Sequence, residues 1–327
     1  MKATTGRRPV RTLVTGATGF VGRHLVAHLA AVGDEVAISE AEITEPDALE
    51  ADFDGSRPDA VYHLAAQADV QASFTDPAAT LRVNVEGTFN VLAAARRAGA
   101  GRVVVISSAD VYGKVGPECL PVDESCAMLP VTPYGASKAA AEMVCLQAGL
   151  GRGLDVIRAR AFNHLGPGQS DRFVAAALAS RVAANERNGS QVVRVGNLLA
   201  KRDFTDVRDV VRAYRLLAVN GESGEAYNVC SGAARAISEL AEALIARARH
   251  PMRLEADGEL LRPVDVAEVS GDPSKLHDAT GWRPEVPLEQ TLDDLLDFWR
   301  CRTADLSDTP GGSATAESEL PSWGDSQ

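Results

Sequence analysis

A glycine-rich turn near the N-terminus constrains the fold of this chain more than any other feature of its sequence. Residues 10–15 form a short apolar run, Gly16-Ala17-Thr18-Gly19-Phe20-Val21-Gly22 follows, and an amphipathic pattern begins at Phe20. A strand, a G-x-x-G-x-x-G turn and a helix in this order are typical of a dinucleotide-binding sheet. Gly16 would take the tight turn, Gly19 would let backbone approach a pyrophosphate, and Gly22 would let the helix pack on the strand. The predicted cofactor contacts here are Gly16, Gly19, Phe20, Val21 and Gly22.

Strand-like and helical patterns alternate through the first half of the chain. Apolar runs of strand length occupy residues 10–15, 35–39, 59–64, 102–107 and 154–161. Ala-rich stretches with apolar residues three and four apart lie between most of them, at 20–32, 78–98 and 134–148. Repeated strand–helix units predict an α/β fold with a doubly wound parallel Rossmann sheet, covered by helices on both faces.

The pattern loosens after Asp171, which indicates a smaller α/β lobe for the substrate. Helical stretches lie near residues 173–185, 207–219, 237–249 and 288–299, and the apolar run at 226–230 is predicted to return to the first sheet. The dinucleotide-binding domain would comprise residues 1–163 and 204–230, and the substrate lobe residues 164–203 and 231–302. The tail at 303–327 is rich in Ser, Thr, Gly and acids and has no Lys or Arg, so we expect it to be disordered.

The charge balance disfavours some classes of partner. The chain has 33 Lys and Arg against 45 Asp and Glu, a net charge of −12. An acidic chain is a poor match for nucleic acid, whereas a few local arginines can still hold a small anion. No uncharged apolar run has the length of a membrane span and no signal-peptide core is evident, so no membrane partner is expected.

Cysteines and histidines give no sign of a metal centre. The five cysteines form no C-x-x-C pair, which suggests reduced thiols in a cytoplasmic protein. His24 and His28 are four apart on the first predicted helix, as metal ligands can be, but a third ligand is missing. We therefore predict no bound metal and regard both as ordinary helix-face histidines.

A tyrosine and a lysine follow the fourth predicted strand at a spacing that suits carbonyl reduction. That strand leads into Ser107-Ser108, and Pro133 opens a helical stretch in which Tyr134 and Lys138 share one face. A lysine ammonium beside the phenol is expected to lower the pKa of Tyr134 toward working pH. Such a tyrosine can pass a proton to a carbonyl oxygen while a nicotinamide supplies hydride to carbon. A serine hydroxyl from the strand end can hold the same oxygen.

Together with the glycine turn, this pattern resembles the extended short-chain dehydrogenase/reductase family over about residues 10–302. Further matches are His63-Leu64-Ala65-Ala66 after the third strand, Asn84 in Asn84-Val85-Glu86-Gly87-Thr88, and Asn163 after the fifth strand. The resemblance implies that Ser108, Tyr134 and Lys138 are catalytic. It also implies that the cofactor contacts Leu64, Ala65, Ala66, Tyr134 and Lys138, with Lys138 on the nicotinamide ribose.

The end of the second strand bears on the choice of cofactor. In NAD-binding sheets this strand supplies an acid to the adenosine ribose. Here it ends in Ser39-Glu40. Glu40 could serve as that acid, but the small Ser39 leaves room for a 2′-phosphate. NADP(H) is therefore favoured, and NAD(H) stays open.

Four later stretches narrow the resemblance to a nucleotide-sugar branch of the family. Residues 162–169, 196–204, 262–266 and 271–275 resemble the branch of GDP-mannose 4,6-dehydratases and GDP-4-keto-6-deoxymannose reductases. The resemblance implies that Arg202 and Arg262 hold the phosphates and ribose of a nucleotide-diphosphate sugar, GDP-linked by preference, with Asn163 near the sugar. It also implies a homodimer, because helices at 76–98 and 133–148 correspond to those that pair across a two-fold axis.

The residues after Ser108 separate the reactions of that branch. The dehydratases resembled here carry a glutamate at the position of Asp110 as base on sugar carbon 5, and related dehydratases carry an acid at the position of Ala109. Ketoreduction needs neither group. We predict an NAD(P)H-dependent 4-ketoreductase of a nucleotide-linked 4-keto-6-deoxyhexose. The alternatives are a GDP-mannose 4,6-dehydratase, a nucleotide-sugar C4 epimerase and, more distantly, a non-catalytic dinucleotide-sensing regulator.

Overall fold

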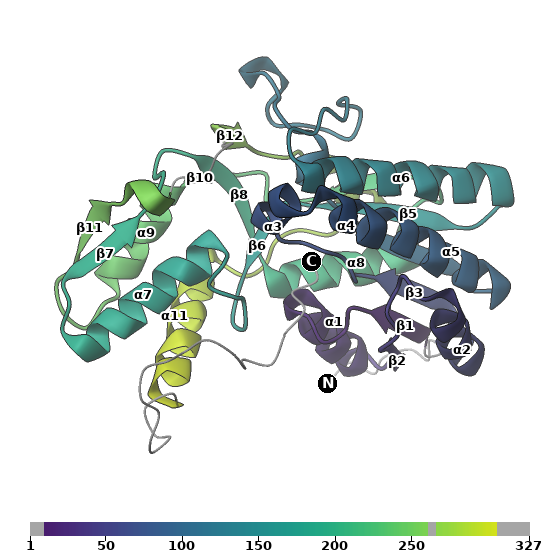
Figure 1. The fold of residues 1–327 in the computed structure, drawn as a ribbon, viewed down its shortest axis with the longest axis horizontal. Helices are drawn as coiled ribbons and strands as arrows, with labels where there is room; N and C mark the ends of the chain where they lie inside the picture. The colour runs from purple at the N-terminus through teal and green to yellow at the C-terminus, as the bar shows by residue number, and fades with distance from the viewer. Residues whose placement is uncertain (1–9, 261–265, 306–327) are drawn as a thin grey trace.

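The protein is described by a computed structural model that covers residues 10–260 and 266–305. Figure 1 shows a larger lobe built on a parallel sheet beside a smaller one. The last described helix, α11 (Leu288–Asp305), includes residues 303–305, so the predicted disorder is wrong there. In this last turn Thr303 Oγ1 donates to Trp299 O at 2.9 Å. The rest of the predicted tail lies outside the described residues.

The larger lobe contains a six-stranded parallel sheet, which confirms the predicted doubly wound α/β fold. Its strands run in the order β2 (Glu35–Ser39), β1 (Arg11–Thr15), β3 (Ala60–His63), β4 (Arg102–Ser108), β5 (Val156–Ala161) and β9 (Ala226–Val229). The run predicted to return to this sheet does so, as β9 beside β5. Because β2 and β3 flank β1, the strand order reverses at the carboxyl ends of β1 and β3, where ligands of such sheets bind.

Helices cover both faces of the sheet because successive strand residues point to opposite sides. On one face, α1 (Phe20–Ala31) and α8 (Val207–Asn220) pack in a core that includes Val14 and Val104. On the other face lies a second core around Leu13 and Val103. The helices over it are α2 (Pro46–Ser56), α5 (Gly87–Arg97) and α6 (Pro133–Arg152).

The predicted helix at 78–98 is interrupted. After α3 (Val70–Thr75), α4 (Pro77–Leu81) leads into a π-helical turn at Arg82–Glu86, and α5 then continues. A π turn inserts one extra residue into a helix and is frequent at functional sites. Asn84 lies in this turn.

The smaller lobe combines two short sheets with three helices. Strand β8 (Lys201–Asp206) pairs with β6 (Asn163–Leu165), β10 (Ala234–Ala236) and β12 (Glu268–Val269), and β7 (Val192–Val195) pairs with β11 (Arg253–Ala256). Helices α7 (Val174–Asn188), α9 (Ile237–Ala246) and α11 enclose a separate apolar core. Helix α10 (Ser274–Thr280) packs instead on α8 and β9 of the larger lobe.

Membrane spans and disulfides do not contribute to this architecture. No helix within residues 10–260 and 266–305 is long and apolar enough to cross a membrane. All five cysteines are free, and Cys145 and Cys230 are buried in apolar cores.

Candidate active site

The glycine turn between β1 and α1 has no room for side chains at its key positions. Gly16 has a φ of 70°, in the left-handed region that favours glycine. A Cβ on Gly22 would lie 2.1 Å from Gly16 O. Gly19 caps α1 without a side-chain hydrogen bond, so the first N–H groups of the helix stay available to an anion. Phe20 and Val21, the first two residues of α1, are buried in the core below the turn.

His63, at the end of β3, ties the glycine turn to the segment that follows. Its Nδ1 lies 2.8 Å from Thr15 Oγ1, and its Nε2 lies 3.1 Å from Thr88 Oγ1. The Thr88 hydroxyl donates to Asn84 O, so it accepts from Nε2–H, and Nδ1 accepts from Thr15. Burial lowers the pKa of His63 to about 3, and the ring is neutral. Residues 64–66 therefore start from a fixed position beside the turn.

Of the three predicted cofactor contacts in that segment, two are accessible. Leu64 is buried in the core shared with α1, whereas Ala65 and Ala66 are partly exposed. The amide of Ala65 donates to Thr15 Oγ1 at 3.4 Å.

Asn84, in the π turn, connects this segment to α6. Its Nδ2 donates to Gln67 O at 3.0 Å and to Ser137 Oγ at 2.8 Å, while its Oδ1 accepts from Gln67 N–H at 2.8 Å. Ser137 Oγ in turn donates to Tyr134 O at 2.7 Å. The π turn thus helps to set the position of the helix that carries the catalytic candidates.

Ser108, Tyr134 and Lys138 are all buried at the carboxyl edge of the sheet, with exposed fractions of 6%, 1% and 6%. Thr132 caps α6 by accepting from Gly135 N–H at 2.9 Å, and Pro133 opens the helix. Lys138 Nζ lies 6.0 Å from the centre of the Tyr134 ring and donates to Ile106 O at 2.9 Å. Within the described residues, the Tyr134 hydroxyl has no hydrogen-bond partner.

The charge states at this edge differ from the sequence expectation for the tyrosine. Burial raises the pKa of Tyr134, the Asp110 carboxylate raises it further, and only the nearby Ser108 hydroxyl acts in the opposite direction. The expected lowering of this pKa is wrong because burial dominates and Lys138 Nζ is directed to the β4 carbonyl. Burial also lowers the pKa of Lys138 to about 8, against the opposing influence of Cys145 and Glu142. The phenol is therefore protonated at neutral pH, and the lysine is charged below about pH 8.

The structure brings two of the three substrate candidates onto neighbouring strands. Asn163 is exposed at the start of β6 and lies opposite Phe204 of β8, two residues beyond Arg202. Arg202 is half-buried, and its Nη1 donates to Lys201 O at 2.8 Å. Arg262 lies outside the described residues.

At the end of β2 stands a hydroxyl rather than a carboxylate. Ser39 is buried, and its Oγ donates to Asp52 Oδ2 on α2 at 2.6 Å. Glu40 is exposed.

The structure shows separate surroundings for the side chains of His24 and His28. His24 Nε2 lies 2.9 Å from Pro167 O, and burial lowers the pKa of both rings. Among the residues that the structure describes, no group of three or more His, Cys, Asp or Glu is arranged to hold a metal ion.

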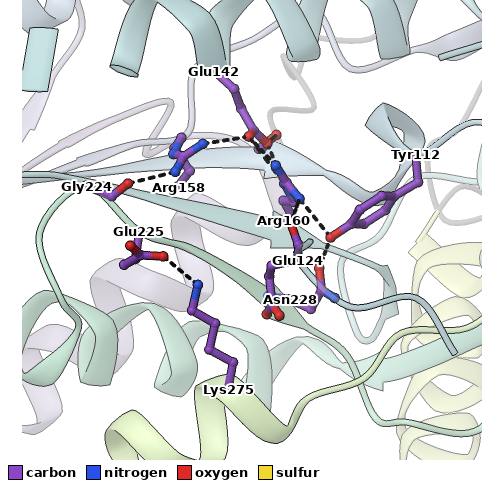
Figure 2. Close-up of polar contacts among 10 residues, drawn as sticks. Tyr112, Glu124, Glu142, Arg158, Arg160, Gly224, Glu225, Asn228 and Lys275 are labelled. Carbon is purple, nitrogen blue, oxygen red and sulfur yellow. Dashed lines mark hydrogen bonds and ion pairs between the residues drawn. The ribbon is translucent and has the colours of Figure 1, made fainter. Parts of the chain in front are cut away.

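One charged residue of α6 was missed by the sequence reasoning. Glu142 is 1% exposed and holds Arg158 and Arg160 of β5 beneath the catalytic edge (Figure 2). The signal was available, because Glu142 is a lone acid in an apolar stretch, four residues after Lys138.

Comparisons with known proteins agree with this geometry. Residues 12–230 match the model of the NAD dependent epimerase/dehydratase family. The chain is 44% identical over 299 residues to the GDP-6-deoxy-D-mannose reductase of Pseudomonas aeruginosa, a match that covers 89% of this chain and 98% of that one. It is 30% identical over 322 residues to the UDP-glucose 4-epimerase of Mycolicibacterium smegmatis, covering 89% and 99%.

A solved structure matches as well. The structure of RMD from Pseudomonas aeruginosa complexed with NADPH has a TM-score of 0.84 and 42% sequence identity, and the match covers 90% of this chain and 99% of that one. The strand–turn–helix unit that opens the fold lies, apart from Arg11, within the part that the family model matches. This chain therefore belongs to the NAD dependent epimerase/dehydratase family.

Proposed function

We propose that the protein is an NADPH-dependent 4-ketoreductase of a nucleotide-linked 4-keto-6-deoxyhexose, with GDP-4-keto-6-deoxymannose as its first candidate substrate. The observation that carries this proposal is the buried Tyr134 hydroxyl, which has no partner among the described residues and lies at the sheet edge with Ser108 and Lys138. A ketone oxygen is a suitable acceptor for such a phenol. The similarity to a GDP-6-deoxy-D-mannose reductase supports the same reaction and the GDP-linked substrate.

The residues at the glycine turn fit a dinucleotide, and the end of β2 favours the phosphorylated form. The turn offers helix N–H groups to an anion, and Gly22 lets the helix pack against the turn where a Cβ would clash with Gly16 O. Ser39, the last residue of β2, is itself small and uncharged, and its hydroxyl donates to Asp52 on α2, so the strand ends without the carboxylate that typically binds the ribose of NAD. The similar structure complexed with NADPH supports this choice. When bound, NADPH would supply the hydride that reduces the ketone carbon.

Three side chains would take part in protonating the ketone oxygen. Tyr134 would donate its proton to the ketone oxygen as that oxygen gains charge. The oxygen of Ser108 accepts a hydrogen bond from Asp110 N–H at 3.2 Å, so its own hydroxyl proton is left for the same ketone. Lys138, charged below about pH 8, would stabilise the phenolate that Tyr134 leaves.

The residues after Ser108 favour reduction over dehydration. Elimination of water from GDP-mannose needs a base at carbon 5, which Ala109 cannot be. Asp110 is one methylene shorter than glutamate, and a misplacement of about 1 Å can cost roughly 10²-fold in rate. The Asp110 carboxylate also raises the pKa of Tyr134, which keeps the proton donor loaded.

The smaller lobe would hold the nucleotide sugar. A guanidinium suits a diphosphate geometrically, and Arg202 lies on the strand next to Asn163. We assign Arg202 and Arg262 to the nucleotide phosphates and ribose, and Asn163 to the sugar. On this assignment residues 1–163 and 204–230 bind the cofactor, and residues 164–203 and 231–302 bind the sugar nucleotide.

Assembly as a homodimer through α5 and α6 completes the proposal. Phe89, Met143 and Leu150 on these two helices are 44%, 47% and 88% exposed. The two helices pack against each other, and exposed apolar residues on such a pair suit four-helix packing across a two-fold axis.

A pair of assays tests the reaction. In the first, NADPH oxidation is followed by absorbance with GDP-4-keto-6-deoxymannose, and we expect one NADPH consumed per ketone reduced. In the second, GDP-mannose is supplied without added cofactor, and no 4-keto product should form. If the wild type dehydrates GDP-mannose and Asp110→Asn does not, the protein is a GDP-mannose 4,6-dehydratase and the proposed reductase activity is wrong.

A further inference from the structure

The buried carboxylate of Glu142 joins α6 to the strand that carries Ser108. Ser107 Oγ donates to Glu142 Oε1 at 2.6 Å, and one turn earlier Lys138 Nζ donates to Ile106 O at 2.9 Å. Two consecutive residues of β4 are thus held by two side chains four apart on α6. The next residue of β4 is Ser108, so these contacts fix the register between the serine and the helix of Tyr134.

Two buried arginines hold this carboxylate from the β5 side. Arg160 Nε and Nη2 donate to Glu142 Oε1 and Oε2 at 2.9 and 2.8 Å, and Arg158 Nη1 donates to Oε2 at 3.3 Å. Arg158 is 8% exposed and Arg160 is 4% exposed. In register, Arg160 is the partner of Ser107, so both strands beside the catalytic edge converge on one carboxylate.

The same network reaches the chain beyond Ser108. Arg160 Nη1 donates to Tyr112 Oη at 2.9 Å, and the Tyr112 hydroxyl donates to Asn228 Oδ1 of β9 at 2.6 Å (Figure 2). Tyr112 directly follows the short turn at Ala109–Val111. Ser108 is therefore held on one side through Ser107 and on the other through Tyr112.

We propose that Glu142 is a positioning residue for the proposed reduction: it keeps Ser108 in register with α6 and places its carboxylate one helical turn from the Lys138 ammonium. This inference rests on the catalytic roles proposed above for Ser108 and Lys138. In the described part of the chain, the hydrogen bonds and ion pairs of the Glu142 carboxylate go to Ser107, Arg158 and Arg160, so we expect it to act through these neighbours.

The charges around Lys138 determine in which direction its pKa should change when Glu142 is replaced. Burial opposes the charged form of Lys138, whereas the Glu142 carboxylate, and a thiolate at Cys145 if one formed, favour it. His63 of β3 is neutral, and Tyr134 and Cys145 are protonated because burial raises the pKa of both. Asp110 acts on Tyr134, and Glu124 O binds Arg160. Glu142 is thus the negative charge next to Lys138 on α6, and Arg158 and Arg160 are the positive charges opposite it on β5.

Two substitutions should move the Lys138 titration in opposite directions. Glu142→Gln keeps the size and an acceptor for Ser107 but leaves both arginines uncompensated, so the pKa of Lys138 should fall by about half a unit or more. Arg158→Gln removes a positive charge while Arg160 still holds the carboxylate, so that pKa should rise. The chain has five lysines, and NMR of [6-13C]lysine-labelled protein, with Lys138 assigned from Lys138→Met, measures each titration without turnover.

Kinetics and a matched control separate this effect from lost stability. In Glu142→Gln, kcat with GDP-4-keto-6-deoxymannose should fall at least tenfold at neutral pH, with KM little changed. The alkaline limb of the pH profile should shift to lower pH together with the pKa of Lys138. Asp34→Asn is the control, since Asp34 is also a buried carboxylate paired with an arginine, Arg215, in the same lobe. It should lower the Tm without moving the Lys138 titration.

Two results would overturn the proposal. One is a Lys138 titration within about 0.2 pH unit of wild type in Glu142→Gln. If Glu142→Gln does not fold, the titration is measured in Arg158→Gln instead. A Lys138 pKa that does not rise in this variant would overturn the proposal. Because the NMR titration needs no substrate, it distinguishes failure of this proposal from failure of the proposed reductase activity.

Discussion

At the scale of single residues, burial decides what the catalytic candidates can do. The spacing of Tyr134 and Lys138 was enough to place them on one helical face, and the structure confirms that placement. Spacing could not reveal that the phenol would be buried with no hydrogen-bond partner in residues 10–260 and 266–305, or that Lys138 would bind a strand carbonyl. Glu142 was missed for the same reason, since its partners Arg158 and Arg160 come from a distant strand.

Removal of the Tyr134 hydroxyl tests the proton donor. Tyr134→Phe keeps the ring and its packing, so NADPH affinity should be largely retained while turnover falls by about 10²-fold or more. Fluorescence titration with NADPH and steady-state assays at 340 nm measure the two quantities. Turnover near the wild-type level would contradict the assignment.

The pH dependence follows from Lys138. Its pKa is lowered to about 8, so the ammonium that would stabilise the Tyr134 phenolate is present below that pH and is lost as pH rises through it. The kcat/KM for ketone reduction should therefore decline on the alkaline side with a midpoint near pH 8. A profile that stays flat well above this pH would rule out a requirement for the charged lysine.

Ser39 should set the preference between cofactors. Ser39→Asp places a carboxylate at the end of β2, where it would repel a 2′-phosphate and accept from a ribose hydroxyl. The ratio of kcat/KM for NADPH over NADH should fall by roughly tenfold or more, which corresponds to about 1.4 kcal/mol. Glu35→Gln is the control, because Glu35 is exposed at the opposite end of β2, and it should leave the ratio unchanged.

At the scale of elements, regular strands and amphipathic helices were predictable, and polar or irregular ones were not. The five strands of the first half appear within two residues of their expected ends, because each contains a short cluster of apolar or β-branched residues. The helix α2 was missed because its sequence is acidic, with only Leu49 and Phe53 buried. The π turn was missed because it depends on contacts of Asn84 with Gln67 and Ser137, which no local pattern encodes.

The glycine turn makes a steric prediction at this scale. A Cβ at Gly22 would lie 2.1 Å from Gly16 O and 2.7 Å from Ala17 Cα, both backbone atoms that cannot move without opening the turn. Gly22→Ala should lower the free energy of unfolding by about 1–3 kcal/mol and weaken NADPH binding. Gly55→Ala is the matched control, since no atom lies within 4 Å of its added Cβ, and it should be neutral or stabilising. If thermal denaturation showed that Gly22→Ala and Gly55→Ala are equally stable, the predicted steric clash at Gly22 would be wrong.

At the scale of the whole molecule, the sequence predicted two lobes and the return of β9, but not the contacts within the smaller lobe. Its short strands β10 and β12 are edge pieces of two or three residues, too brief for an alternating pattern. Arg202 and Asn163 are brought together by the pairing of β6 with β8, which only the tertiary fold determines.

The proposed dimer makes a prediction about mass. Light scattering at micromolar concentration should give twice the mass of one chain. Met143→Glu puts a charge on the exposed face of α6 and should yield a monomer with its Tm reduced. Leu199→Glu is the control, because Leu199 is 86% exposed in the other lobe, and it should leave the mass unchanged. A monomeric wild type would remove the proposed interface.

Strand β9 lies far from β5 in the sequence, which has a consequence for synthesis on the ribosome. A nascent chain that has emerged as far as Ala161 contains five strands, but the outer edge of β5 stays unpaired until Val229 has followed. Helix α8, which covers α1, also comes from this later segment. The first sheet therefore cannot be completed until residues 162–225, which include β6, α7, β7 and β8, have been synthesised. Ribosome-bound chains stalled before residue 207 should be cleaved readily by protease, whereas chains released beyond residue 305 should resist it.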